Sequence, residues 1–456
     1  MEIEKLARVQ KQYFESGRTL SLKSRLKALD KLKEVIQQKE PQIKAALKKD
    51  LNKSGFESYM TEIGLTLSEL SYTRQHLSSW MKNKTTGTPI TQFPSKSYVI
   101  SEPFGVVLIM SPWNYPFMLC MEPLIGALAA GNCCILKPSN DSPHVSGMIK
   151  EIIEKIFPQE YVAVVEGGRE ENRQLLEQKF DYIFFTGGVK VGKLVMEKAA
   201  QHLTPVTLEL GGKSPCIIEE SADLKLAAKR LVFGKFLNAG QTCVAPDYVL
   251  VQSSVKKEFL RYVVGWIKKM YGNELENKED YPKIINEKHF QRICSLIKGE
   301  KVVIGGTWNK ETLQIAPTVL VNVTSDAPIM KEEIFGPVLP ILEFDTIKEA
   351  KAFVRARPKP LALYLFTKNK KAEQEFLSQV SFGGGCINDT IVHLASSYTG
   401  FGGVGASGMG SYHGKESFRT FSHRKSILKK SNYLDINVRY MPYTTVKEWL
   451  LRFLLK

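Results

Sequence analysis

The sequence has few of the features that mark secreted, zinc-binding or membrane-spanning proteins. Its seven cysteines are an odd number, and none forms a C-x-x-C pair or accompanies paired histidines. Neither a disulfide framework nor a zinc site is therefore indicated. No stretch approaches the roughly 18 apolar residues that a spanning helix needs, and the mixed-charge residues 1–5 lack the apolar core of a secretory signal. We expect a cytoplasmic protein with free thiols and no metal site.

Charge of one sign is in excess, but it does not form a nucleic-acid-binding pattern. The formal net charge is +16 in a chain with 43% hydrophobic and 24% charged residues, an ordinary composition for two or three globular domains. Acidic residues alternate with the basic ones along most of the chain, and no module of stacking aromatic residues accompanies them. We therefore expect a solvated basic surface and no nucleic-acid partner.

The C-terminal stretch is the exception to this mixed charge. Residues 423–456 hold eight Lys/Arg against two acids and end in the apolar, basic segment 449–456. Such a tail is suited to weak contact with an anionic membrane surface. The alternative is a short terminal helix docked on its own protein, which is favoured because the apolar part is barely two turns long.

Hydrophobic periodicity predicts the architecture. Residues 2–50 and 57–82 have leucines and charges at helical spacing, which predicts a helical N-terminal segment. Apolar runs then alternate with helical patterns and predict a parallel, doubly wound sheet with ligands at the carboxyl ends of its strands. The predicted strands lie at 97–100, 106–110, 133–136, 162–165 and 182–185, and the helices at 146–156 and 191–200. A second alternation from 206 to about 389, with runs at 249–251, 302–304 and 338–342, predicts a second α/β domain.

Two glycine-rich patterns compete as phosphate-binding loops. Residues 400–405 and 403–408 both match G-x-G-x-x-G, but neither follows a predicted strand, so the match is weak. Gly187, Gly188 and Gly192 are better placed, because they follow an apolar strand and open a helix whose N-terminus could reach a pyrophosphate. From the residues alone, an ordinary turn between strand and helix remains an alternative.

One thiol stands out among the seven. Residues 236–246 read Phe-Leu-Asn-Ala-Gly-Gln-Thr-Cys-Val-Ala-Pro and place Cys243 among small and amide-bearing residues. A thiolate in such a setting can attack a carbonyl carbon, whereas a buried structural cysteine is an inert small hydrophobe. Cys243 is therefore the candidate nucleophile.

The segment around Cys243 closely resembles the active-site signature of the aldehyde dehydrogenase superfamily. Four further motifs occur in that family's order: Ser-Pro-Trp-Asn-Tyr-Pro at 111–116, Leu-Lys-Pro-Ser at 136–139, Leu-Glu-Leu-Gly-Gly-Lys-Ser-Pro at 208–215 and Glu-Glu-Ile-Phe-Gly-Pro at 332–337. The resemblance covers nearly the whole chain, and the segment 407–414 is most similar to the class 3 branch. Taken singly, Asn114 would be read as a turn residue, and Glu209 and Glu333 would be read as surface or capping acids. The joint occurrence of all three in the family's order disfavours these structural interpretations.

The resemblance implies how the chain is divided into domains. It implies an NAD(P)-binding domain at 1–82 and 101–208, a catalytic domain at 209–395, bridging segments at 83–100 and 396–430 that serve oligomerisation, and a tail at 431–456. A homodimer is the implied assembly. The fold class is thus two doubly wound α/β domains, one Rossmann-like for the cofactor and one carrying the thiol, with a small oligomerisation arm.

The resemblance also implies the cofactor site. The implied contacts are Trp113, Lys137 (adenosine ribose), Asn140, Gly187, Gly188, Gly192, Glu333 (nicotinamide ribose) and Phe335. Three positions depart from the family's usual pattern. A hydroxyl residue is usual where Gly188 stands and frequent where Val189 stands, and an acid often stands where this chain has Asn140. A neutral amide there would not repel a 2′-phosphate, so we expect either NAD or NADP, unless Asp141 restores discrimination.

The implied chemistry is aldehyde oxidation. Cys243 attacks the aldehyde carbon, and the Asn114 side-chain amide and the Cys243 backbone N–H hold the resulting oxyanion. Hydride leaves for the nicotinamide, and Glu209 activates the water that hydrolyses the thioester. Glu209 is also a candidate for helping to ionise Cys243. Tyr115, Met118, Phe233 and Phe401 imply an apolar tunnel for medium or long aliphatic or aromatic aldehydes.

Two other function classes stay open at this point. A cysteine hydrolase or acyltransferase without a redox cofactor would need a partner histidine, and His202, His289, His393 and His413 each lack a supporting motif. A non-catalytic scaffold with a dead enzyme fold is disfavoured because all three catalytic positions carry reactive side chains.

Overall fold

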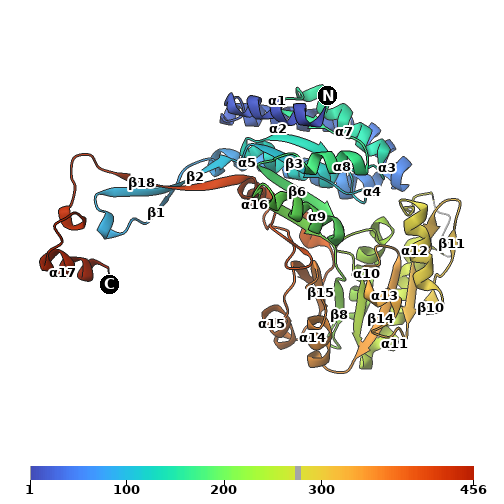
Figure 1. Ribbon diagram of the computed structural model, residues 1–456. Coiled ribbons are helices and arrows are strands. Elements are labelled where there is room, and N and C mark those ends of the chain that lie inside the picture. The colour runs from blue at the N-terminus through green and yellow to red at the C-terminus, as the bar shows by residue number, and fades with distance from the viewer. Residues whose placement is uncertain (1, 273–278, 456) are drawn as a thin grey trace.

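Two mostly parallel sheets form the two halves of the molecule, one above the other in Figure 1. The computed structural model describes residues 2–272 and 279–455, so Met1, residues 273–278 and Lys456 of the predicted domains lie outside the described residues. Both sheets carry helices on their faces, which confirms the predicted α/β class. An arm of antiparallel strands extends from the upper half.

The first sheet contains the predicted cofactor strands. These are β3 (Val106–Met110), β4 (Cys133–Lys137), β5 (Val162–Val164), β6 (Tyr182–Gly187) and β7 (Val206–Leu210). They are parallel in the order β5-β4-β3-β6-β7, so the chain reverses its direction of growth between β3 and β6. Ligands of doubly wound sheets bind outside the carboxyl ends of the strands at such a reversal. The loops after β3 and β6 therefore position the site.

Helices cover this sheet on both faces. They are α1 (Ile3–Glu15), α2 (Leu22–Gln38), α3 (Glu40–Leu51), α5 (Gly64–Trp80), α6 (Met118–Ala130), α7 (Pro143–Ile156), α8 (Arg169–Leu176) and α9 (Val189–Ala200). All residues of α6 are buried, as its continuous apolar sequence predicts. The predicted helix at 57–82 is interrupted in one respect: α4 (Gly55–Ser58) leads into a π-helical turn, η1 (Tyr59–Ile63), before α5 begins.

The second sheet carries the thiol domain. Its strands are β8 (Pro215–Ile218), β9 (Tyr248–Gln252), β10 (Lys301–Ile304), β13 (Thr318–Val321), β14 (Val338–Phe344), β15 (Ala362–Phe366) and β16 (Gly384–Ile387). The order is β10-β13-β14-β9-β8-β15-β16, with β10 antiparallel at the edge. Its longer helices are α10 (Leu224–Phe236), α11 (Lys256–Tyr271), α12 (Glu287–Ile297), α14 (Ile347–Arg355) and α15 (Lys370–Gln379). Shorter elements are α13 (Pro328–Lys331), β11 (Trp308–Asn309) and β12 (Gln314–Ile315).

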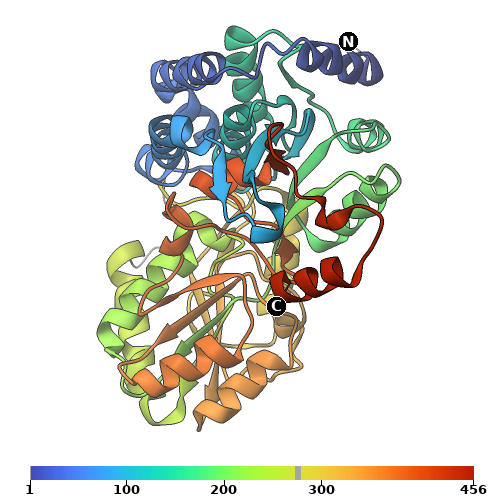
Figure 2. The same cartoon turned by 90° about the vertical axis from the view of Figure 1, so that its left-hand side faces the viewer.

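The arm consists of β1 (Lys84–Thr86), β2 (Ser95–Pro103) and β18 (Ser422–Lys430), and α17 (Thr445–Leu454) lies at its far end (Figures 1 and 2). None of the described residues of α17 is buried. The tail thus forms the predicted short helix, but the expectation that it docks on its own protein is wrong. Over the described part of the chain, no helix combines the length and the apolar character needed to traverse a membrane.

Two strands cross the predicted domain limits. β2 continues past the limit at 100/101, and β7 continues to Leu210, past the limit at 208/209. Apolar runs locate a strand but not its polar ends, and Glu209 is the charged residue of β7. The predicted catalytic glutamate therefore belongs to the first sheet.

The G-x-G-x-x-G matches lie at the edge of that sheet. β17 (Gly408–Met409) pairs antiparallel with β7, with Gly408 opposite Glu209, before α16 (Gly414–Thr420) begins. Gly408 has a φ of +136°, and a Cβ there would lie 2.0 Å from the carbonyl oxygen of Leu208. These glycines therefore allow two backbones to pack closely beside the glutamate.

Replacing Gly408 by alanine is expected to destabilise the fold. The left-handed backbone and the Cβ collision predict a loss of about 1–3 kcal/mol in the free energy of unfolding, measured by urea denaturation. Gly265→Ala in α11 is the control, because a Cβ there meets nothing within 4 Å. That variant is expected to gain roughly 0.5–1 kcal/mol. Equal stability of both variants would contradict this account of Gly408.

Candidate active site

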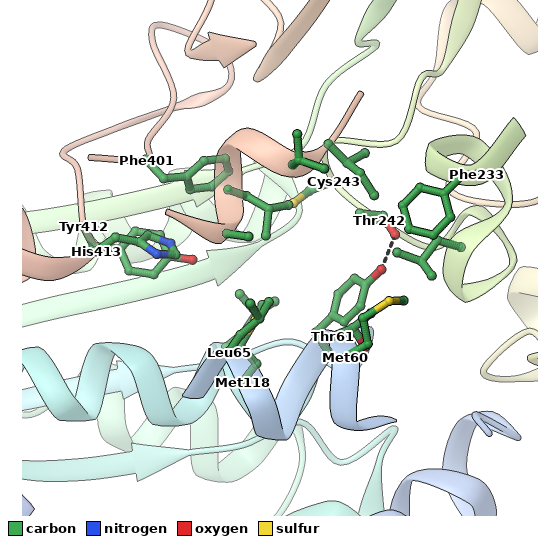
Figure 3. Close-up of a pocket in the computed structure, with 17 residues that line it drawn as sticks. Met60, Thr61, Leu65, Met118, Phe233, Thr242, Cys243, Phe401, Tyr412 and His413 are labelled. Atoms are coloured by element: carbon green, nitrogen blue, oxygen red, sulfur yellow. Dashed lines mark hydrogen bonds between the residues drawn. The ribbon is translucent and has the colours of Figure 1, made fainter. Parts of the chain in front are cut away.

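Cys243 lies where two cavities meet. One, of about 190 Å³, is almost entirely apolar, and the other, of about 360 Å³, is more polar; Cys243 and Leu119 line both. Figure 3 shows Cys243 on the wall of the apolar cavity, with Phe233 on one side and Phe401 on the other. The predicted nucleophile is thus one of the two residues that both cavities share.

The apolar cavity contains the predicted substrate residues. Tyr115, Met118, Phe233 and Phe401 all line it. Sequence reasoning missed other parts of its wall, which come from distant segments: Met60, Thr61, Leu65, Leu237, Ile391, Val392, Leu394, Tyr412 and His413. The π-helical turn η1 contributes Met60 and Thr61, and an irregular turn of this kind gives no signal in apolar periodicity.

The polar cavity contains most of the predicted cofactor residues. Trp113, Gly187, Gly188, Glu333 and Phe335 line it, together with Asn114 and Glu209. His289 and Arg292 of α12, which the sequence did not indicate, also line it. The His289 and Phe335 rings lie 5.3 and 5.4 Å from that of Trp113, centroid to centroid.

Three predicted cofactor residues lie outside this cavity's lining. Lys137 ends β4, and its Nζ donates to the carbonyl oxygens of Pro138 (2.9 Å) and Gly167 (2.8 Å), while burial lowers its pKa. Asn140 is exposed in the turn after it. Gly192 lies in α9, where a Cβ would be 2.6 Å from Cδ2 of Leu210. Gly192 therefore allows the close packing of helix on strand that cofactor sheets require.

The backbone before Cys243 explains its Asn-Ala-Gly sequence. After α10 ends, Asn238, Ala239 and Gly240 have φ of 52°, 51° and 73°, all left-handed. A Cβ on Gly240 would lie 2.3 Å from the carbonyl oxygen of Gly336, so only glycine fits. The left-handed conformation of Ala239 is strained, and such strain gathers where a site fixes its backbone. This path carries the thiol to the junction of the cavities.

Asn114 is held from two sides. Its backbone carbonyl oxygen accepts hydrogen bonds from Asn238 Nδ2 at 2.8 Å and Lys53 Nζ at 3.1 Å. Its own Nδ2 donates one bond to the Gln241 carbonyl oxygen at 3.0 Å. A side-chain amide has two N–H groups, so one remains for an oxyanion. Next to it, the Tyr115 hydroxyl shares a 2.6 Å hydrogen bond with Thr242 Oγ1.

Burial governs the proton affinity of the reactive groups. It raises the pKa of the Cys243 thiol to about 12, with added contributions from the charges of Glu333 and Glu209. Glu209 is buried, neither of its oxygens has a hydrogen-bond partner among the described residues, and desolvation raises its pKa well above the ordinary range. Its charge opposes the thiolate, so Glu209 could assist ionisation of Cys243 only by accepting the proton.

The polar cavity fits a nucleotide cofactor. Burial raises the pKa of Glu333 to about 8, and its buried Oε1 has no hydrogen-bond partner among the described residues, so the group is an available acceptor for hydroxyls. Gly188 precedes the twelve-residue α9, and a Cβ added to Gly188 would meet nothing within 4 Å. This open helix N-terminus presents backbone N–H groups to a phosphate. Within the described part of the chain, no cluster of three or more potential ligands is arranged for a metal ion.

The histidines do not support a cysteine hydrolase. His413 lines the cavity of Cys243, but its Nε2 lies 3.7 Å from Glu122 Oε2, and burial lowers its pKa to about 3. His393 lies 3.6 Å from Cys386 instead, and burial lowers its pKa to about 4. Imidazoles of such low basicity are poorly suited to remove a thiol proton near neutral pH.

Comparison with known proteins gives a consistent result. The model of the aldehyde dehydrogenase family matches residues 1–427. A 4,4'-diaponeurosporen-aldehyde dehydrogenase of Staphylococcus aureus is 49% identical over 95% of this chain and 95% of its own, and a rat dimeric NADP-preferring aldehyde dehydrogenase is 45% identical over 94% and 95%. The solved substrate-bound state of Staphylococcus aureus AldH has a TM-score of 0.97 and 47% identity, covering 99% of both chains. The resemblance seen in the sequence is thereby confirmed, and the chain belongs to the aldehyde dehydrogenase family.

Proposed function

We propose that this enzyme oxidises medium- or long-chain aliphatic or aromatic aldehydes to carboxylic acids with NAD or NADP, through a thioester on Cys243. The observation that carries the proposal is the position of Cys243, which lines both the apolar cavity and the polar cavity. A cysteine hydrolase would not need the second cavity. An inert scaffold would not need the Glu209 carboxylate or the Glu333 Oε1 in the cavity of the thiol, both buried and without a hydrogen-bond partner among the described residues.

The chain's own residues account for each part of the reaction. The apolar wall holds the aldehyde chain. The Cys243 thiol proton passes to solvent, through Glu209 or directly, and the sulfur bonds to the carbonyl carbon as the C=O π electron pair moves to the oxygen. The resulting thiohemiacetal oxyanion accepts from Asn114 Nδ2 and the Cys243 backbone N–H. When bound, the nicotinamide cofactor supplies the hydride acceptor. Glu209 then takes a proton from water as that water attacks the thioester, which releases the acid and the thiol. Its raised pKa suits this base role.

The cofactor residues fall into two groups. Trp113, Gly187, Gly188, Glu333 and Phe335 would hold the nicotinamide and phosphate part in the polar cavity. Lys137 and Asn140 would reach the adenosine ribose from the carboxyl end of β4, with Gly192 keeping α9 close to the sheet. Because Asn140 is a neutral amide, we expect NADP to be accepted as well as NAD. The NADP-preferring rat relative supports this expectation.

We infer that the protein acts as a homodimer in the cytoplasm. The dimeric rat relative and the arm that extends beyond the two halves support the dimer, and seven free thiols suit a reducing compartment.

The exposed apolar side chains of α17, with its lysine and arginine, also suit weak contact with an anionic membrane surface. Sedimentation with anionic and neutral vesicles measures that contact, and equal recovery with both would contradict it.

The direct test of the function is the absorbance of reduced nicotinamide on mixing the protein with hexanal and NAD or NADP. We expect turnover with the native chain and none with Cys243→Ala, because the alanine lacks the nucleophile. Cofactor binding by the variant, measured by calorimetry, should be retained. Substantial residual turnover in Cys243→Ala would exclude the thioester route.

Glu209→Gln is expected to separate hydride transfer from thioester hydrolysis. The amide has nearly the same shape but cannot accept a proton, so stopped-flow should show a burst of reduced cofactor followed by slow turnover. In the native enzyme, the rate of thioester hydrolysis should fall as pH drops through the raised pKa of Glu209. The variant should not show this decrease with pH. A variant without a burst, or with the native pH profile, would assign the base to another group.

Chain length is expected to control catalytic efficiency. Each methylene buried in the apolar cavity is worth about 0.8 kcal/mol, so kcat/KM should rise roughly tenfold or more from acetaldehyde to hexanal or benzaldehyde. Steady-state kinetics over the aldehyde series measures this. Equal efficiency with acetaldehyde, or a requirement for a charged aldehyde, would reject the substrate class and leave the family assignment intact.

A further inference from the structure

A fully buried ion pair lies behind the segment that carries Asn114. Lys53 and Glu62 have 0% side-chain exposure, and Nζ lies 2.5 Å from Oε1. Removing two charges from water is expensive, and apolar residues of similar volume often stabilise a core equally well or better. A pair in this position therefore suggests a role in addition to stability.

The remaining polar contacts of the pair converge on one short segment. Lys53 Nζ donates to the Asn114 carbonyl oxygen at 3.1 Å and lies 4.0 Å from the centre of the Tyr115 ring. Glu62 Oε2 accepts from the backbone N–H groups of Phe117 at 2.9 Å and Met118 at 3.3 Å, at the start of α6. Residues 114–118 are thus held at both ends by one pair of charges.

The local fold of Glu62 is irregular at this point. Glu62 lies in η1, the π-helical turn that separates α4 from α5. Single π-turns within helices occur frequently at functional sites. The same turn provides Met60 and Thr61 to the wall of the apolar cavity. One irregular turn therefore contributes both to the substrate wall and to the support of Asn114.

We propose that Lys53 and Glu62 are positioning residues for the oxyanion-binding amide. The ion pair fixes the backbone of residues 114–118, so that the free N–H of Asn114 Nδ2 meets the oxygen of the substrate bound to Cys243. This inference rests on the proposed function, because it takes Asn114 as the oxyanion donor. Neither residue touches the substrate, and both act through Asn114.

The experiment compares two readouts on the same full-length variant, Lys53→Met. Oxidation of hexanal uses the oxyanion site, whereas alkylation of Cys243 by iodoacetamide forms no oxyanion. Because small misplacements in a catalytic site can lower rates by about 10²-fold, kcat/KM for hexanal is expected to fall by roughly 10². The alkylation rate constant and the affinity for the cofactor should be unchanged. The control Lys351→Met, which breaks the Lys351–Glu375 pair of α14 and α15, should leave both readouts at the native level.

A second variant tests the proposal in case Lys53→Met fails to fold. Lys53→Met/Glu62→Gln removes both charges of the pair, and the glutamine oxygen can still accept from the backbone of α6. The same loss of kcat/KM with native alkylation is expected from this double variant. Parallel loss of oxidation and alkylation in a folded variant would show a merely structural role and overturn the proposal.

A double-mutant cycle with Asn114→Ala tests the route of action. That substitution alone is expected to lower kcat/KM by about 10²–10³, the usual effect of losing one oxyanion donor. If Lys53 acts through Asn114, adding Lys53→Met should cause no further loss. Additive losses, or native kcat/KM in Lys53→Met, would overturn the positioning role alone. Native activity in Asn114→Ala would overturn the oxyanion assignment in the proposed function, and the positioning role with it.

Discussion

Exclusion of water from one small volume is the constraint on which the site depends. The Cys243 thiol and the carboxylates of Glu209 and Glu333 all lose hydration there, and burial raises the pKa of each. Desolvation disfavours charge, and the charges of Glu333 and Glu209 disfavour the thiolate further. The resting thiol therefore holds its proton, which limits its reactivity towards adventitious electrophiles. The two domains are needed together, because each contributes one wall of this volume.

The topology explains how distant segments reach that volume. The loops after β3 and β6 lie at the reversal point of the first sheet and carry Asn114 and Gly188. β7 brings Glu209 to the same edge, while the left-handed turn after α10 brings Cys243 from the second sheet. Backbone strain at Ala239 and the close approach at Gly240 are local features that this long-range meeting requires.

The sequence was sufficient for the parts of the site that are encoded locally. Strands such as β3 were located at their observed limits, and Cys243, Glu209 and Asn114 lie in short motifs whose order is informative. His289, Arg292, Lys53 and Glu62 were missed because they reach the site only through tertiary packing. The π-turn η1 was missed because an extra residue in a helical turn barely disturbs apolar periodicity. The docking expected for α17 was wrong because amphipathicity identifies an apolar face but not what covers it.

The arrangement of the cavities has a stereochemical consequence. An aldehyde chain in the apolar cavity would reach Cys243 from that cavity, whereas Glu209 lines the polar cavity that Cys243 also borders. In the proposed mechanism Asn114 fixes the carbonyl oxygen, so the two faces of the planar carbonyl would not be equivalent to the enzyme. The same prochiral face is offered in every turnover, and the configuration of the short-lived tetrahedral carbon follows from the wall that the chain contacts. Handedness at that carbon is thus set by packing, although neither the aldehyde nor the acid is chiral there.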